Sequence, residues 1–205
     1  MENLNYVIHL FHSGGYVMYP LLFLSLMVIA IAVERTFYYR KYAGKTYMVM
    51  HAVNEYAKLQ KWDEIEKVIK ENPSIASRIA EAGLKNSATE EGMKTAFSDQ
   101  MGVDAVGFRK YMDYLSATVT ISPLLGLLGT VTGMIGSFCI LDAGAGASAI
   151  TGGVGEALIA TASGLCVAIM AFIVYTFFSH RLDSIINQIE NMCVNIITAK
   201  REGWK

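Results

Sequence analysis

Charged residues are scarce in this sequence, and their scarcity already excludes several classes of protein. Asp, Glu, Lys and Arg together make up 17% of the 205 residues, whereas about 25% is usual for a soluble domain. Hydrophobic residues make up 53%, and the formal net charge is −1. Disordered chains, coiled coils and nucleic-acid-binding proteins all depend on a high density of charge. The composition therefore argues against all three.

Cysteine and the motifs of catalytic or metal sites are rare as well. Cys139, Cys166 and Cys193 lie far apart and form no CxxC pair, so neither a disulfide framework nor a zinc site is expected. The sequence has no HExxH motif, and its glycine-rich GLLGTVTG segment lacks the lysine that a phosphate-binding loop needs. We therefore predict that the protein is not an enzyme and holds neither a metal nor a cofactor.

Charged residues are absent or nearly absent from three long stretches of the chain. No Asp, Glu, Lys or Arg lies between Glu2 and Glu34 or in residues 114–141, and Glu156 is the only one in residues 143–180. A helix needs roughly 20 apolar residues to cross about 30 Å of hydrocarbon. A buried helix of a soluble protein could account for one such stretch but not for three in so short a chain. The sequence predicts an all-α integral membrane protein with transmembrane helices at 16–36, 114–141 and 150–179.

The basic residues predict the orientation of these helices. Every Lys and Arg lies in residues 35–110 or 181–205. By the positive-inside rule, the regions 37–113 and 180–205 are cytoplasmic, and the segment 1–15 and the loop 142–149 lie outside. The first span has no basic residues before it and runs directly into Glu34-Arg35, so we expect a permanent anchor rather than a cleaved signal peptide.

The predicted cytoplasmic regions have the periodicity of helices. Apolar residues recur every three or four positions in residues 47–57, 62–69 and 75–84, and the second of these helices should end at Asn72-Pro73. An apolar stripe also continues the third span to about residue 200. Each cytoplasmic region is thus expected to extend the membrane helices.

The segment Ser87-Ala-Thr-Glu90 has the pattern of a capping box, with Ser87 as the N-cap. No strong helix breaker follows it before Pro123. The sequence therefore predicts a helix that begins at about residue 88 and runs into the second span.

Small residues line the second and third spans. Spacings of three and four place Gly126, Thr130, Gly133 and Ser137 near one face of a helix. Such a face allows close helix packing in lipid, and its hydroxyls could equally line a narrow hydrated path. We expect the glycines to serve packing, and both alternatives stay open for Thr130. The residues expected in helix packing are Gly126, Gly129, Gly133, Gly153 and Gly164.

Glu156 is the acid within the third span. A charge at the centre of a bilayer costs at least about 2.5–3.5 kcal/mol, and the chain supplies no membrane-embedded Lys or Arg to offset it. Glu156 must therefore be protonated, hydrated, near the outer interface or paired with another chain. Thr161 lies about 140° around the helix from Glu156, so the two are expected to have different roles. The residues predicted to line a pore or ion path are Thr130, Ser137, Glu156, Thr161 and Ser163.

Two segments carry a resemblance to a known family. Residues 122–135, SPLLGLLGTVTGMI, resemble the second-helix signature of the MotA/TolQ/ExbB proton-channel proteins, and residues 155–169, GEALIATASGLCVAI, resemble their third-helix signature. The Glu34-Arg35 pair at the inner end of the first span also fits. Three spans and a short chain are similar to the ExbB/TolQ branch, because MotA-type proteins have an additional pair of spans.

This resemblance implies a subunit of a homopentamer in the bacterial inner membrane, with a periplasmic N-terminus and a cytoplasmic C-terminus. The pentamer would enclose a dimer of a single-span ExbD/TolR-like partner. Proton flow would move that dimer and so energise a TonB- or TolA-like protein. In the family, polar residues matching Thr130, Glu156 and Thr161 face the lumen near the partner's aspartate. The alternative is a structural scaffold of an envelope complex that conducts no ions.

The chain departs from the family pattern at two places. Met170 stands where members commonly have proline, so the inner half of the third span is expected to be straighter. Thr176 stands where members often have asparagine. The resemblance leaves open which process is energised: siderophore or cobalamin uptake, envelope constriction, gliding or secretion.

Overall fold

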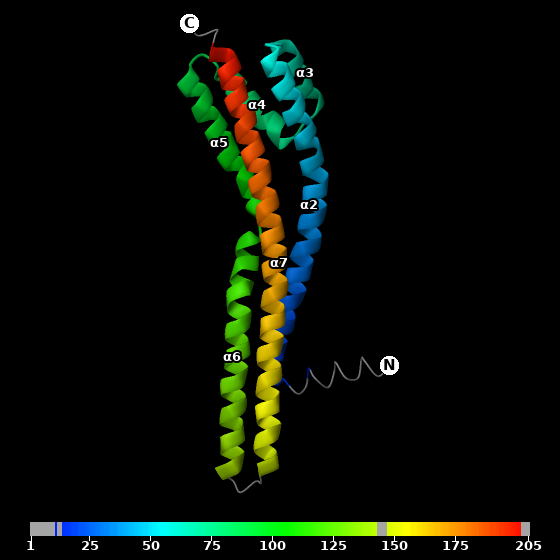
Figure 1. Ribbon diagram of the computed structural model, residues 1–205, viewed down its shortest axis with the longest axis vertical. Coiled ribbons are helices and arrows are strands. Elements are labelled where there is room, and N and C mark those ends of the chain that lie inside the picture. The colour runs from blue at the N-terminus through cyan, green and yellow to red at the C-terminus, as the bar shows by residue number, and fades with distance from the viewer. Residues whose placement is uncertain (1–10, 12–13, 143–146, 202–205) are drawn as a thin grey trace, which may run out of the picture. The chain divides into compact units, whose positions relative to one another are not determined.

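The computed structural model describes Phe11, residues 14–142 and residues 147–201. Most of the segment 1–15 and half of the predicted outer loop 142–149 therefore lie outside the described residues. Within them the chain forms the helices α2 to α7 and no strand (Figure 1). The prediction of an all-α protein is confirmed.

Three of these helices are long and apolar enough to cross a membrane. They are α2, α6 and α7. With 41 and 54 residues, α2 and α7 exceed the roughly 20 residues that a bilayer requires. The helices are α2 (Met18–Lys58), α3 (Trp62–Glu71), α4 (Ile75–Lys85), α5 (Glu90–Arg109), α6 (Met112–Asp142) and α7 (Ala147–Lys200).

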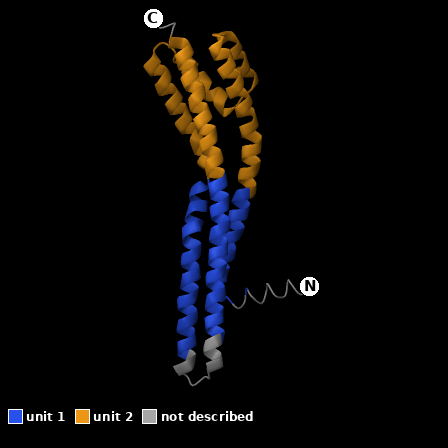
Figure 2. Cartoon of the chain, viewed as in Figure 1, with its two compact units in different colours: residues 1–32, 111–177 blue, residues 33–110, 178–205 orange. Residues whose placement is uncertain are grey.

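The chain divides into two compact units, coloured separately in Figure 2. Unit 1 consists of residues 1–32 and 111–177, and unit 2 of residues 33–110 and 178–205. Helices α2 and α7 contribute residues to both units. The apolar spans fall mainly in unit 1, and most of the charged residues fall in unit 2.

Unit 1 has a small core and an apolar exterior. Val28 and Ile31 of α2 pack with Leu115 of α6 and Ala171 of α7 in one buried cluster. Many large apolar side chains point outward, among them Phe23, Leu127 and Ile173. A soluble protein would bury such residues, whereas a membrane bundle exposes them to lipid.

Unit 2 is a helical bundle with a conventional buried core. Helix α4 packs on both α3 and α5, and the ring of Phe97 lies where a side chain on Gly83 would stand. The expected stripe of α7 is buried at Ile185, Ile189 and Ile196. Helix α3 ends at Glu71, directly before Asn72-Pro73, as the sequence predicts.

Ion pairs hold the edges of unit 2. The guanidinium of Arg78 on α4 binds Asp104 on α5 through two nitrogens, and this hydrogen bonding raises the pKa of Arg78. Near the end of α7, Arg201 binds Glu90 at 3.1 Å. The pKa of Glu90 is lowered, first by the hydrogen bond from Lys94 and then by that from Arg201. The Arg201–Glu90 pair joins segments that are 111 residues apart in the sequence.

The continuous helix predicted from residue 88 into the second span is wrong. Helix α5 ends at Arg109 and α6 begins at Met112, and Tyr111 between them has a φ of 67°. That left-handed conformation is costly for a residue with a Cβ atom and interrupts a right-handed helix.

A buried arginine explains where α5 ends. Arg35 of α2 is 1% exposed, and its Nη1 donates to the carbonyl of Gly107 at 3.0 Å and to that of Phe108 at 3.4 Å. Carbonyls in the last turn of a helix lack backbone partners. Arg35 supplies these partners from another helix and also pairs with Glu34 at 2.6 Å.

The predicted N-cap of α5 is also wrong by two residues. The capping side chain is Thr89, whose hydroxyl accepts a hydrogen bond from the Gly92 N–H at 3.1 Å. Ser87 instead accepts a hydrogen bond from Lys200 at 2.9 Å. Thr89 has the extended backbone of an N-cap, with a φ of −135° and a ψ of 152°, and it directly precedes the first residue of α5.

Candidate functional site

Several glycines of α6 lie against α7. A Cβ atom added to Gly126 would stand 3.0 Å from the Cα of Thr161, and one added to Gly133 would stand 3.1 Å from the Cβ of Ala157. On α7, a Cβ atom at Gly164 would stand 2.6 Å from the carbonyl oxygen of Ser122. These separations leave no room for side chains, so the two helices pack backbone to backbone.

Two more of the predicted packing glycines lie on the same helix pair. Gly129 of α6 faces the Cβ of Ala160, and Gly153 of α7 faces the side chain of Ser137. The structure thus brings together the five glycines that the sequence singles out, from both helices. Close packing fixes the positions of the hydroxyl groups that lie beside them.

The hydroxyl of Thr161 links the two helices. Its Oγ1 donates to the carbonyl oxygen of Gly126 at 3.0 Å. The hydroxyl of Thr130 donates within α6, to the carbonyl of Leu127 at 2.6 Å. A hydroxyl has one proton to donate and two lone pairs that accept. Both threonines have therefore used their proton and can still accept hydrogen bonds.

Glu156 and Ser137 line one cavity of about 610 Å³. Its walls come from residues 14–20, from α6 and from α7, and Thr132 also lines it. The Ser137 hydroxyl donates to the Gly133 carbonyl at 2.9 Å. In the part of the chain that the structure describes, no hydrogen bond or ion pair engages the exposed Glu156 carboxylate. Neither Thr130 nor Thr161 lines this cavity, so the predicted residues do not form a single cluster.

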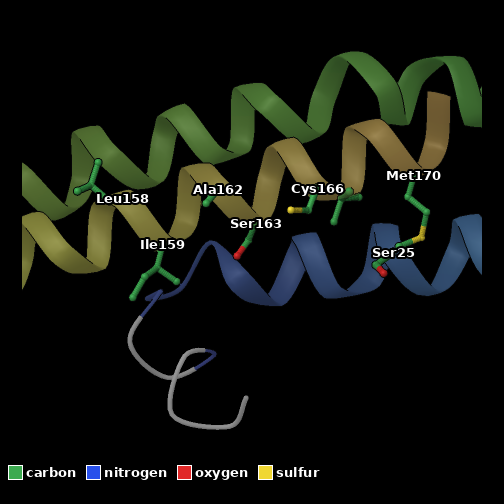
Figure 3. Close-up of a pocket in the computed structure, with 8 residues that line it drawn as sticks. Ser25, Leu158, Ile159, Ala162, Ser163, Cys166 and Met170 are labelled. Atoms are coloured by element: carbon green, nitrogen blue, oxygen red, sulfur yellow. The ribbon is translucent and has the colours of Figure 1, made fainter. Parts of the chain in front are cut away.

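Ser163 lies in a second cavity, of about 530 Å³, between α7 and α2. Figure 3 shows its hydroxyl on the side of α7 that faces α2, which carries Ser25. The other lining residues are Leu158, Ile159, Ala162, Cys166, Val167 and Met170. Ser25 and Ser163 are thus two hydroxyls in an otherwise largely apolar groove.

Sequence reasoning missed two residues beside Glu156. Thr132 lines the cavity together with Gly129, Gly133 and Gly136. These residues are spaced by three, one and three, so they share a helical face that could have been recognised. Gly15 also lines the cavity, but nothing in its local sequence reveals a contact with a residue so far along the chain.

Metal ligation finds no support in the described ranges, where no three His, Cys, Asp or Glu residues come close enough to hold an ion. Cys139 and Cys166 are exposed free thiols, and Cys193 is a buried one. Within the described residues of the predicted spans at 114–141 and 150–179, the polar chemistry therefore consists of hydroxyls, thiols, backbone carbonyls and the Glu156 carboxylate.

Comparison with known proteins relates this helix pair to a family. Residues 71–191, which contain the paired glycines and hydroxyls of α6 and α7, match the family described as MotA/TolQ/ExbB proton channels. This chain belongs to that family. It is therefore a membrane protein of a proton-channel family rather than of an enzyme family.

Individual relatives place the chain in the ExbB/TolQ-like branch of the MotA/TolQ/ExbB family. An ExbB-like protein of Synechocystis sp. is 30% identical over 172 residues, which cover 81% of each chain. The biopolymer transport protein ExbB of Salmonella typhimurium is 37% identical over 49% of this chain and 43% of its own length. The Tol-Pal system protein TolQ of Pseudomonas aeruginosa is 32% identical over 60% of this chain and 55% of its own.

Proposed function

We propose that this chain is the channel-forming subunit of an inner-membrane motor that turns the proton-motive force into mechanical work. The observation that carries the proposal is the close packing of α6 on α7 within the region matched by the family. This packing holds Thr161, Ser137 and Glu156 along one helix pair. The second and third spans contain no Lys or Arg that would repel protons.

The partner in this proposal is a dimer of an ExbD/TolR-like single-span protein inside a pentamer of this chain. A membrane aspartate of that partner would carry the proton, because Glu156 lies only about two turns into the predicted third span. Thr130 and Thr161 have their protons bound to backbone carbonyls. They would therefore accept hydrogen bonds from water or from a protonated carboxyl group beside them.

The output of the motor would be work on a TonB- or TolA-like protein of the cell envelope. In this arrangement the N-terminus is periplasmic and the C-terminus cytoplasmic, as the distribution of Lys and Arg favours. Ser163, in the groove between α2 and α7, stays a candidate for the ion path. Names of relatives include both ExbB and TolQ, so both kinds of envelope system remain alternatives.

Proton flux into liposomes tests the proposal against the alternative of a passive scaffold. The chain is reconstituted with and without an ExbD/TolR-like partner, a membrane potential is imposed with valinomycin, and an internal dye reports pH. We expect flux only when both proteins are present, and a matched partner lacking its membrane aspartate should give none. An assembled complex that passes no protons would favour the scaffold.

A further inference from the structure

A glycine turn precedes α2 and lies against Glu156. Gly15 has a φ of 68°, and its carbonyl accepts a hydrogen bond from the Met18 N–H at 3.2 Å. The position that a Cβ atom would take on Gly15 is already occupied by the Oε1 of Glu156. The next nearest atoms are the Cδ and Cγ of the same side chain, at 3.5 and 3.8 Å.

The neighbouring glycine faces other residues. The three atoms nearest to a Cβ atom on Gly14 belong to the side chains of Met18 and Ile159, at 2.5–3.3 Å, and not to Glu156. Met18 is a flexible side chain that can move aside. The two adjacent glycines therefore differ in the side chain that lies nearest to an added Cβ atom: Glu156 at Gly15 and Met18 at Gly14.

We propose that Gly15 is a positioning residue for Glu156. The bare backbone of the turn lets the carboxylate lie at the cavity that it shares with Thr132 and Ser137. A side chain at position 15 would occupy that place and push the carboxylate away from the turn. The functional importance of this placement rests on the proposed ion path, but the contact itself does not.

Two effects of substitution at Gly15 must be separated. Alanine would introduce both a clash with Glu156 and backbone strain at positive φ, whereas asparagine tolerates the left-handed region better and keeps the clash. Glu156→Asp withdraws the carboxylate by one methylene group and so relieves the clash without altering the backbone. A contact effect should disappear in the Glu156→Asp background, whereas a strain effect should persist there.

The experiment measures how fast a carbodiimide modifies residue 156, by mass spectrometry of the full chain in detergent at one fixed pH. We expect Gly15→Ala and Gly15→Asn to accelerate modification by about fivefold, the factor produced by roughly 1 kcal/mol. Gly14→Ala is the matched control and should leave the rate unchanged. In the Glu156→Asp background, Gly15→Asn should have no effect on the rate.

Equal rates for Gly14→Ala and Gly15→Asn would overturn the proposal, and so would an acceleration that persists with aspartate at position 156. The measurement does not require proton flux. A chain that conducts no protons but shows the expected rates would refute the channel and leave the role of Gly15 intact. Normal proton flux with unchanged modification rates would support the channel and refute the role of Gly15.

Discussion

Thr161 shows what a single hydroxyl contributes to the helix pair. Its hydrogen bond to the Gly126 carbonyl at 3.0 Å joins α7 to α6 at a point where a Cβ on Gly126 could not fit. Interhelical hydrogen bonds in membranes contribute about 0.6 kcal/mol on average and at most about 1.7 kcal/mol. The bond is therefore too weak to account for the assembly of the bundle by itself.

Thr161→Val should accordingly leave the protein folded and strongly reduce proton flux. Valine nearly matches threonine in shape but can neither donate nor accept a hydrogen bond. Flux in liposomes and abundance in the membrane are measured together, with Thr161→Ser as the control that keeps the hydroxyl. Full flux with valine would show that Thr161 serves only packing.

The type of residue in the sequence pointed to some members of the candidate site but not to Gly15. Glu156 and Thr161 stand out because they are polar in an apolar stretch. Their spacing places them on different faces of α7, where one lines a cavity and the other binds α6. Gly15 does not stand out, because its importance depends on a contact with a residue on α7. Such contacts follow from packing, which no local pattern encodes.

At the scale of the helices, some ends could be predicted from the local sequence and others could not. The end of α3 before Pro73 is a local effect of proline and was predictable. The end of α5 depends on Arg35, which lies 72 residues earlier and binds the Gly107 carbonyl. Glycines in residues 88–123 suggested no specific break, and Tyr111 is an uncommon residue for a positive φ. The break was therefore missed because a distant side chain stabilises it.

Replacing glycine by alanine should change the stability of the protein in opposite directions at two positions of α7. Alanine normally stabilises a helix relative to glycine by roughly 0.5–1 kcal/mol. At Gly155 no atom lies within 4 Å of an added Cβ, whereas at Gly164 the Ser122 carbonyl lies at 2.6 Å. We expect Gly155→Ala to be neutral or stabilising and Gly164→Ala to destabilise by about 1–3 kcal/mol.

Thermal unfolding of the two variants in the same detergent checks this contrast. Gly136→Ala serves as the corresponding control on α6, because nothing lies within 4 Å of its added Cβ. Equal midpoints for Gly155→Ala and Gly164→Ala would mean that α6 and α7 do not pack as closely as described.

The contact between the end of α7 and the start of α5 should depend on pH. Hydrogen bonds from Lys94 and Arg201 lower the pKa of Glu90. Stabilisation by this carboxylate is therefore complete above the ordinary Glu pKa of about 4.3. It is lost as the pH falls through the lowered value, because protonation removes the charge.

A comparison of unfolding midpoints for the parent and Glu90→Gln between pH 7 and pH 3 isolates this effect. Glutamine carries no charge at any pH, so the parent should be more stable near neutrality and the two curves should converge in acid. A difference that stays constant over the whole range would contradict the assignment to Glu90.

For the whole molecule, exposed apolar residues outside the spans indicate association. Val103 and Val106 on α5 are each 69% exposed, and they lie in unit 2, away from the apolar stretches that lipid would cover. We expect contact with another protein surface to shield these side chains from water. The proposed pentamer predicts that further copies of this chain provide that surface.

Native mass spectrometry in a mild detergent should therefore show an oligomer larger than a trimer. Val106→Lys should shift the population toward smaller species by placing a charge in the interface, whereas Thr95→Lys, at another position of α5, should not. A parent protein that is mainly monomer or dimer would count against the pentamer proposed above.

The hydrogen bonds of Arg35 also have a consequence for biosynthesis. The carbonyls that it binds belong to residues 72 and 73 positions later in the chain. At about 5–20 residues per second, a ribosome makes that intervening segment in roughly 4–14 s. During this interval the guanidinium has no α5 to bind and must stay in water at the membrane surface. In the proposed orientation, Arg35 would first retain the end of the emerging span on the cytoplasmic side, and only afterwards become the cap that ends α5.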